Sequence, residues 1–158
     1  MVERVRLLRE GDSGEWLRLR RALWPDCAPG EHEREMAAIR GDLDHQPVFV
    51  AERGDGRLGG FVEVALHATA EGCRTGPVGY LEGWYVDPDL RRQGIGRRLV
   101  AAAEAWARRM GCREMASDTS LEYPVSPRAH ARLGYQETRM PLHYRKALAP
   151  EQEAPPPG

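Results

Sequence analysis

A short segment rich in glycine and arginine, between residues 91 and 98, has the composition of a phosphate-binding turn. It follows an apolar run that ends at Val86, and it reads Arg91-Arg92-Gln93-Gly94-Ile95-Gly96-Arg97-Arg98. The first backbone N–H groups of a helix lack partners within the helix, and glycines allow a ligand to approach them closely. The positive end of the helix dipole and the arginine charges add to this, so we expect a pyrophosphate cradle.

Two common nucleotide motifs do not fit this segment. A phosphate loop of the GxxxxGK[ST] type needs a lysine after its second glycine, whereas Lys146 is the only lysine of the chain. A dinucleotide fingerprint needs a third glycine where Leu99 stands. The segment therefore points to a phosphate site outside those two classes.

Two carboxylates lie on expected strands close to this turn. Strand alternation places Glu82 on one face with Tyr80 and Trp84, where an unpaired buried charge would be costly. Asp118 ends a strand, at the edge where open sheets bind ligands. The alternatives are a paired carboxylate at a strand edge for Glu82 and a turn-forming aspartate for Asp118.

Hydrophobic periodicity predicts the elements that position these groups. Helices are expected near 12–23, where Asp12 and Glu15 resemble a capping box, near 36–43, at 96–110 with a buried stripe ending at Met110, and at 126–133. Strands are expected at 5–8, 48–52, 58–66, 78–86, 113–118 and within 135–146. The strand–helix–strand unit over 78–118 implies a parallel pair inside a mixed sheet, an α/β (α+β) fold. We expect one domain over residues 1–148 and a proline-rich, disordered tail over 149–158.

Composition limits the partners. The 158 residues are 41% hydrophobic and 30% charged, with a net charge of −1. This balance argues against a nucleic-acid binder or a polybasic membrane binder. We see neither a signal peptide nor a membrane-spanning run, and Cys27, Cys73 and Cys112 form no metal-binding pattern, so we expect a cytoplasmic protein without a metal site.

The segment Arg91–Gly96 resembles the acyl-CoA pyrophosphate loop of the GNAT family of N-acetyltransferases. The resemblance is closer to the aminoglycoside 6'-N-acetyltransferases, through Leu23-Trp24-Pro25, Leu81-Glu82-Gly83, the run 111–120, His130, Leu133-Gly134-Tyr135 and Tyr144-Arg145-Lys146. It implies the GNAT fold: a mixed, mostly antiparallel, twisted sheet with helices on both faces and a splayed central parallel strand pair. It also implies acetyl-CoA as the co-substrate.

The resemblance assigns residues to both ligands. Acetyl-CoA would contact Trp84, Tyr85, Val86, Arg91, Arg92, Gln93, Gly94, Ile95, Gly96, Arg97 and His130. Gly83, in mid-strand, indicates a bulge or close backbone approach there, or only room for a neighbouring side chain. A cationic aminoglycoside would contact Trp24, Cys27, Glu82, Asp118 and Arg139. The catalytic residues would be Glu82 and Asp118, with His130 or Tyr144 as the acid that protonates the leaving thiolate.

Three departures from the related enzymes put the substrate range in question. Cys27 stands where a histidine is frequent, Arg139 stands where an acidic residue is expected, and residues 66–70 contain no counterpart of an aromatic residue found there in some relatives. The expected function is direct acetyl transfer to an aminoglycoside amine, conferring antibiotic resistance. The alternatives are acetylation of a polyamine, small metabolite or protein N-terminus, or a non-catalytic acyl-CoA sensor. A homodimer is expected because related enzymes are often dimers.

Overall fold

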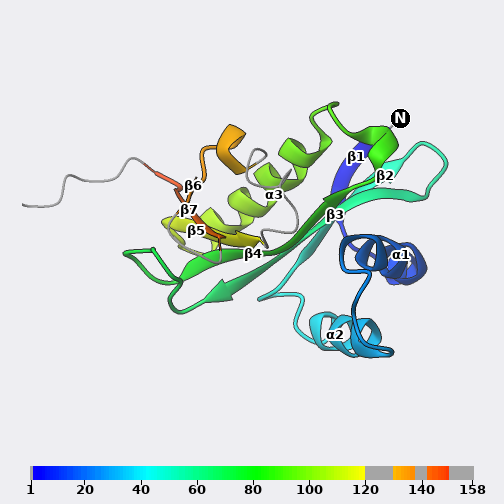
Figure 1. Ribbon diagram of the computed structural model, residues 1–158, viewed down its shortest axis with the longest axis horizontal. Helices are drawn as coiled ribbons and strands as arrows, with labels where there is room; N and C mark the ends of the chain where they lie inside the picture. Colours follow the sequence, from blue (N-terminus) through cyan, green and yellow to red (C-terminus); the bar gives the residue numbers. More distant parts are fainter. Residues whose placement is uncertain (1, 120–129, 138–141, 150–158) are drawn as a thin grey trace, which may run out of the picture.

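The computed structural model describes residues 2–119, 130–137 and 142–149, which build one open, mixed β-sheet (Figure 1). In the described residues the sheet has seven strands in the order β1-β2-β3-β4-β5-β7-β6, and only β4 and β5 are parallel. The strands are β1 Val2–Leu7, β2 Val48–Arg53, β3 Leu58–His67, β4 Val78–Val86, β5 Glu114–Thr119, β6 Gln136–Glu137 and β7 Leu142–Ala147. This arrangement confirms the expected mixed, mostly antiparallel sheet.

Helices cover both faces of the sheet. The helix α3 (Ile95–Arg109) lies on one face, and α1 (Ser13–Leu23) and α2 (Glu31–Arg40) lie on the other (Figure 1). Residues 130–132 are also helical. Leu99, Ala103 and Trp106 form the expected buried stripe of α3. Met110 does not continue the stripe: the helix ends just before it, and Met110 is among the exposed large hydrophobic residues.

Two local expectations at the N-terminal end were wrong. Asp12 and Glu15 do not form a capping box, because both carboxylates have partners outside α1. Asp12 accepts hydrogen bonds from the Arg9 N–H and from the guanidinium of Arg6 on β1, both at 2.7 Å. Glu15 accepts one from the Leu58 N–H at 3.2 Å. The second helix also ends earlier than expected, at Arg40, and a run of turns leads from there to β2.

The parallel strands β4 and β5 pair over only three residues and then part. Their register runs from Gly79 opposite Met115 to Leu81 opposite Ser117. Beyond that point β4 continues to Val86 against β3, while β5 continues against β7. No described strand pairs with the edge of β4 that faces this gap, so its backbone groups there are left for a ligand. The expected splay is confirmed.

A β-bulge lies on β4 at the same level. Glu63 on β3 faces Gly83, and the next residue, Val64, faces Leu81, so Glu82 is an extra residue without a partner in the register. A bulge bends its strand and re-aims the side chain at the extra position. The splay and the bulge together place Glu82 at the opening between β4 and β5.

Candidate active site

The bulge changes which side chains share a face with Glu82. Tyr80 lies on the same face and near the Glu82 charge, as expected. Trp84 lies on the opposite face, where its ring packs on Gly96 of α3. Strict alternation was therefore wrong beyond the bulge, because the extra residue inverts the order of faces. The Glu82 side chain is also 41% exposed, so it is not the buried charge that alternation suggested.

Glu82 and Asp118 lie at the two ends of a chain of contacts through two rings. The His67 Nε2 lies 2.5 Å from Glu82 Oε1. The His67 ring stacks on Tyr80, with centroids 4.5 Å apart. The Tyr80 hydroxyl donates a hydrogen bond to Asp118 Oδ2 at 2.6 Å. The stacked rings of His67 and Tyr80 therefore link the two carboxylates.

A cavity of about 660 Å³ opens beside Glu82 on the face of the sheet that carries α1 and α2. Trp24, at the C-terminal end of α1, and Cys27 both line it, as the resemblance implied. Five of its lining side chains are carboxylates: Asp26, Glu31, Glu35, Glu63 and Glu82. Burial and then the neighbouring Glu31 raise the pKa of Cys27, so its thiol stays protonated near neutral pH. The cavity is therefore anionic, and its chemistry favours a ligand with several positive charges.

A buried ion pair supports the floor of this cavity. Nη1 of Arg20 lies 2.8 Å from both carboxylate oxygens of Glu63, and the Trp16 indole N–H donates to Glu63 at 2.9 Å. The Arg20 Nε–H donates to Nδ1 of His32, so the proton of the neutral ring is on Nε2, which donates to the Trp24 carbonyl oxygen at 3.2 Å. The Arg20 guanidinium also lies 4.9 Å from the centre of the Trp24 ring. The network fixes both the backbone and the ring of Trp24.

The glycine- and arginine-rich turn has the expected form at the start of α3. Gly94 is the N-cap, with a left-handed φ of 78°, and α3 has no acidic residue in its first turn. Arg92 is also left-handed, with φ 65°. The Ile95 side chain is buried in the core and anchors the turn. The free backbone N–H groups at this helix end therefore remain available to an anion.

Two residues of the turn, Arg91 and Gly96, contact β4 or the residues on it. Arg91 bends back, so that its Nε donates to the Val86 carbonyl at 2.9 Å. A Cβ on Gly96 would lie 3.2 Å from the Trp84 ring, so this glycine serves packing against β4 rather than close ligand approach alone. The Trp84 Nε1 is buried without a hydrogen-bond partner among the described residues. This buried N–H beside the turn can therefore donate a hydrogen bond to a ligand or to a water molecule.

Asp87 fixes the base of the turn. Its buried carboxylate accepts hydrogen bonds from Nη1 and Nη2 of Arg18 on α1, at 3.1 and 3.0 Å, and from Nη2 of Arg53 on β2 at 2.9 Å. Burial alone would raise the pKa of Asp87, but the hydrogen bonds from Arg18 and Arg53 lower it below 3.8. Asp87 therefore joins the glycine- and arginine-rich turn to α1, the helix that ends just before Trp24.

The two candidate acids lie together near the gap between the strands. The rings of His130 and Tyr144 stack with centroids 4.2 Å apart and an interplanar angle of 7°. Both residues are 2% exposed. The His130 Nε2 lies 2.8 Å from the Oγ of Ser117, the last residue of β5 that pairs with β4. Ser117 therefore sets the orientation of the His130 ring.

Some expectations fall outside the described residues, and some contacts were missed. Arg139 and residues 150–158 lie outside them, and so does the first half, 126–129, of the helix expected at 126–133. Within the described ranges no cluster of three His, Cys, Asp or Glu side chains could hold a metal ion, and no helix is long and apolar enough to cross a membrane. Sequence reasoning missed His67, Tyr80 and the carboxylates of Glu31 and Glu35, although the four-residue spacing of the last two places them on one helix face.

Comparison with known proteins gives a consistent result. The acetyltransferase (GNAT) family model matches residues 16–135. An aminoglycoside N(6')-acetyltransferase type 1 of Klebsiella aerogenes is 44% identical over 146 residues, which cover 91% of this chain and 96% of that protein. The structure of AAC(6')-Iy with the bisubstrate analogue CoA-S-monomethyl-acetylneamine superposes with a TM-score of 0.79 at 36% identity, covering 86% of this chain and 92% of that one. The apo aminoglycoside 6'-N-acetyltransferase AAC(6')-IG of Acinetobacter haemolyticus also gives a TM-score of 0.79, at 30% identity and 96% and 99% coverage. This chain belongs to the acetyltransferase (GNAT) family.

Proposed function

We propose that the protein transfers an acetyl group from acetyl-CoA directly to the 6'-amine of an aminoglycoside, which would inactivate the antibiotic. The observation that carries this proposal is the place of Glu82. It lines an anionic cavity and lies at the point where β4 and β5 part. A base at the meeting point of a polycation site and a free strand edge is what acylation of a bound amine needs.

The residues present fit acetyl-CoA. The turn from Arg91 to Arg97 would hold the pyrophosphate through the free N–H groups at the start of α3, with Arg92 and Arg97 adding positive charge. The open edge of β4, from Gly83 to Val86, would bind the amides of the pantetheine arm. The orphaned Trp84 N–H lies in the same region. Acetyl-CoA supplies the acetyl group as an activated thioester.

The carboxylates and the stacked rings would handle the protons. Glu82 would take a proton from the substrate ammonium group, since an amine attacks a thioester only in its neutral form. Asp118 would hold a neighbouring ammonium group, and backbone N–H groups of β4 would stabilise the developing oxyanion. His130 or Tyr144 would give a proton to the departing thiolate. This pathway has no covalent enzyme intermediate.

The anionic cavity would select the substrate. One pair of unit charges at 4 Å contributes about 4 kcal/mol at an effective dielectric constant of 20. Arg20 also lines the cavity and pairs with Glu63 and Glu35. Asp26 and Glu31 form no ion pair within the described residues, so these two would also attract the sugar rings away from the reacting amine. Cys27 and Arg139 would set which aminoglycosides fit.

Thiol release from acetyl-CoA measured against a matched substrate pair tests the proposal. Neomycin carries an amine on its 6' carbon, whereas paromomycin carries a hydroxyl there. We expect turnover with neomycin and little or none with paromomycin, and acetylation of the 6' nitrogen in the product by NMR. Equal turnover of the two would reject the regiochemistry, and no turnover of any aminoglycoside would reject the substrate class.

The same assay, run on other amines, addresses the alternative functions. Turnover of a polyamine or peptide amine without turnover of aminoglycosides would favour another N-acetyltransferase, and acetyl-CoA binding without thiol release on any amine would favour a sensor.

We also propose that residues 1–148 form the catalytic domain and that the protein acts as a homodimer in the cytoplasm. Light scattering of the full chain and of a 1–148 variant, with activity of both, tests the dimer and the domain boundary. Fractionation of expressing cells tests the location.

A further inference from the structure

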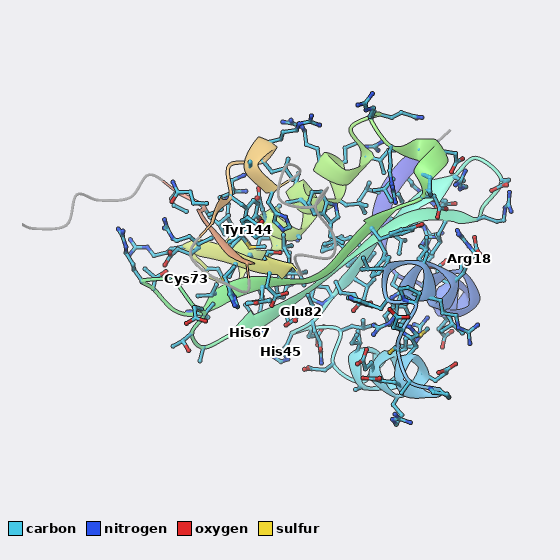
Figure 2. All side chains as sticks on the ribbon, viewed as in Figure 1. Arg18, His45, His67, Cys73, Glu82 and Tyr144 are labelled. Carbon is cyan, nitrogen blue, oxygen red and sulfur yellow. The ribbon has the colours of Figure 1, made fainter. Side chains whose placement is uncertain are left out.

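The contact between His67 and Glu82 joins two partly exposed side chains on neighbouring strands. His67 is the last residue of β3, and Glu82 is the extra residue of the bulge on β4. Their side chains meet at 2.5 Å although they are 38% and 41% exposed (Figure 2). Exposed ion pairs of this kind contribute little to stability. A functional role therefore accounts for this contact better than a contribution to stability does.

The ring of His67 is held in place from the sheet side. It stacks on Tyr80 at an interplanar angle of 18°, and Tyr80 is itself held by its hydrogen bond to Asp118. His45 offers a comparison, since it contacts β3 by accepting the hydrogen bond of the Leu66 N–H through its backbone carbonyl oxygen. Its ring pairs with Asp42 at 2.8 Å.

The hydrogen bond from His67 has a chemical consequence for Glu82. The terminal torsion of a glutamate side chain is soft, so a free carboxylate samples many orientations. A donor from Nε2 of His67 to Oε1 restricts that rotation, while Oε2 has no hydrogen-bond partner among the described residues and Glu82 lines the cavity. A base that is already oriented toward its substrate needs less reorganisation during proton transfer.

We propose that His67 is a positioning residue for Glu82, which occupies one carboxylate oxygen so that the other faces the substrate ammonium group. The inference rests on the proposed function for the role of Glu82.

Three variants test the positioning role. His67→Phe keeps a ring on Tyr80 but removes the donor, whereas His67→Gln keeps an N–H donor. His45→Gln is the control, since its ring is bound to Asp42. With neomycin at pH 8 we expect His67→Phe to lower kcat/KM about tenfold without changing KM for acetyl-CoA, and His67→Gln to recover most of the loss.

The split between kcat and KM distinguishes positioning from a merely structural role. The loss in His67→Phe should lie mainly in kcat for neomycin, because a misaligned base slows proton transfer, while His45→Gln follows the wild type in both parameters. A His67→Phe variant within twofold of the wild type, or a His67→Gln variant that recovers none of the loss, would overturn the inference.

A measurement without turnover keeps the inference separate from the proposed function. The ring nitrogens of His67 can be followed by ¹⁵N NMR in the wild type and in Glu82→Ala. We expect the neutral ring to carry its proton on Nε2 in the wild type and to change its nitrogen shifts when the carboxylate is removed. Identical spectra would overturn the inference even in an active enzyme. If the wild type acetylates no aminoglycoside, the proposed function fails, and the NMR result alone decides whether His67 orients Glu82.

Discussion

The Trp24 ring lies directly against the backbone of Gly83. A Cβ built on Gly83 would come within 2.5 Å of Cη2 of that ring, which is closer than non-bonded carbon atoms approach. Both sequence interpretations of Gly83 are thus met: it flanks the bulge, and it makes room for a side chain. The aromatic wall of the cavity and the strand that carries Glu82 are packed without a gap.

We therefore predict that Gly83→Ala displaces Trp24 from the cavity wall. The added methyl group should cost about 1–3 kcal/mol of unfolding free energy, as overpacking does. It should also raise KM for the aminoglycoside about tenfold, with little change in KM for acetyl-CoA. Thermal unfolding and steady-state kinetics check both.

A control and a rescue test the cause. Gly14 on α1 has nothing within 4 Å of its built Cβ, so Gly14→Ala should leave kinetics unchanged and should not destabilise the protein. In the double variant Gly83→Ala/Trp24→Ala the collision is absent. If Gly83→Ala destabilises as much with alanine at position 24 as with tryptophan, the collision is not the cause.

Asp87 should make stability dependent on acid. Burial raises the pKa of Asp87, but the hydrogen bonds from Arg18 and Arg53 prevail and bring it below 3.8. A carboxyl whose pKa is lower in the folded than in the unfolded state stabilises the fold above the unfolded value, and this contribution is lost as the pH falls through the folded value. We expect Asp87→Asn to cost about 2 kcal/mol at pH 7, because the partner Arg18 is half exposed.

Urea unfolding at pH 7 and pH 3 measures this effect. The difference between the wild type and Asp87→Asn should shrink at pH 3, because below 3.8 the unfolded chain binds a proton at Asp87 more readily than the folded protein does. Asp55→Asn serves as the control, because the pair of Asp55 with Arg57 is exposed. A difference that is the same at both pH values would show that the Asp87 charge does not provide the stabilisation.

Much of the scaffold could be predicted from the sequence because its strongest elements have uninterrupted periods. The boundaries of β4 agree with the expected 78–86, and α3 starts one residue before the expected position. The crossover over 78–118 then required the parallel pair, and with it the position of Asp118 near the carboxyl end of β5. Local periodicity and the handedness of crossovers were sufficient for this part.

The missed contacts depend on pairing between segments that are distant in sequence. The bulge at Glu82 is a property of the register between β3 and β4, so residue alternation on β4 alone could not reveal that Trp84 changes face. His67 and Glu82 meet for the same reason. Asp12 had the right type and spacing for a helix cap, but Arg6 on β1 supplied a stronger, charged partner.

The charge of Arg92 should contribute to acetyl-CoA binding, whereas its backbone conformation should not require an arginine. Its φ of 65° lies in the left-handed region, which asparagine tolerates better than most residues. We expect Arg92→Asn to leave the melting temperature close to that of the wild type while raising KM for acetyl-CoA several-fold, since one cation is lost from the cradle. Arg109→Asn, at the far end of α3, should leave that KM unchanged. If both variants raise KM for acetyl-CoA equally, the effect is one of total charge rather than of the cradle.

Tyr80 should hold Asp118 in place across the working pH range. Burial, the hydrogen bond to Asp118 and the charge of Glu82 raise the pKa of Tyr80, so its hydroxyl keeps the proton and remains a donor. Tyr80→Phe keeps the ring stacked on His67 and removes only that hydrogen bond. We expect KM for the aminoglycoside to rise about fivefold, as for the loss of one hydrogen bond to a charged group, and by the same factor at pH 6 and pH 9.

Kinetics of Tyr80→Phe, Asp118→Asn and the double variant test whether the two residues act together. If Tyr80 works by orienting Asp118, its substitution should have little effect once Asp118 is asparagine, so that the two single effects are far from additive. Additive effects, or an effect of Tyr80→Phe that grows between pH 6 and pH 9, would mean that the hydroxyl acts on the substrate by another route.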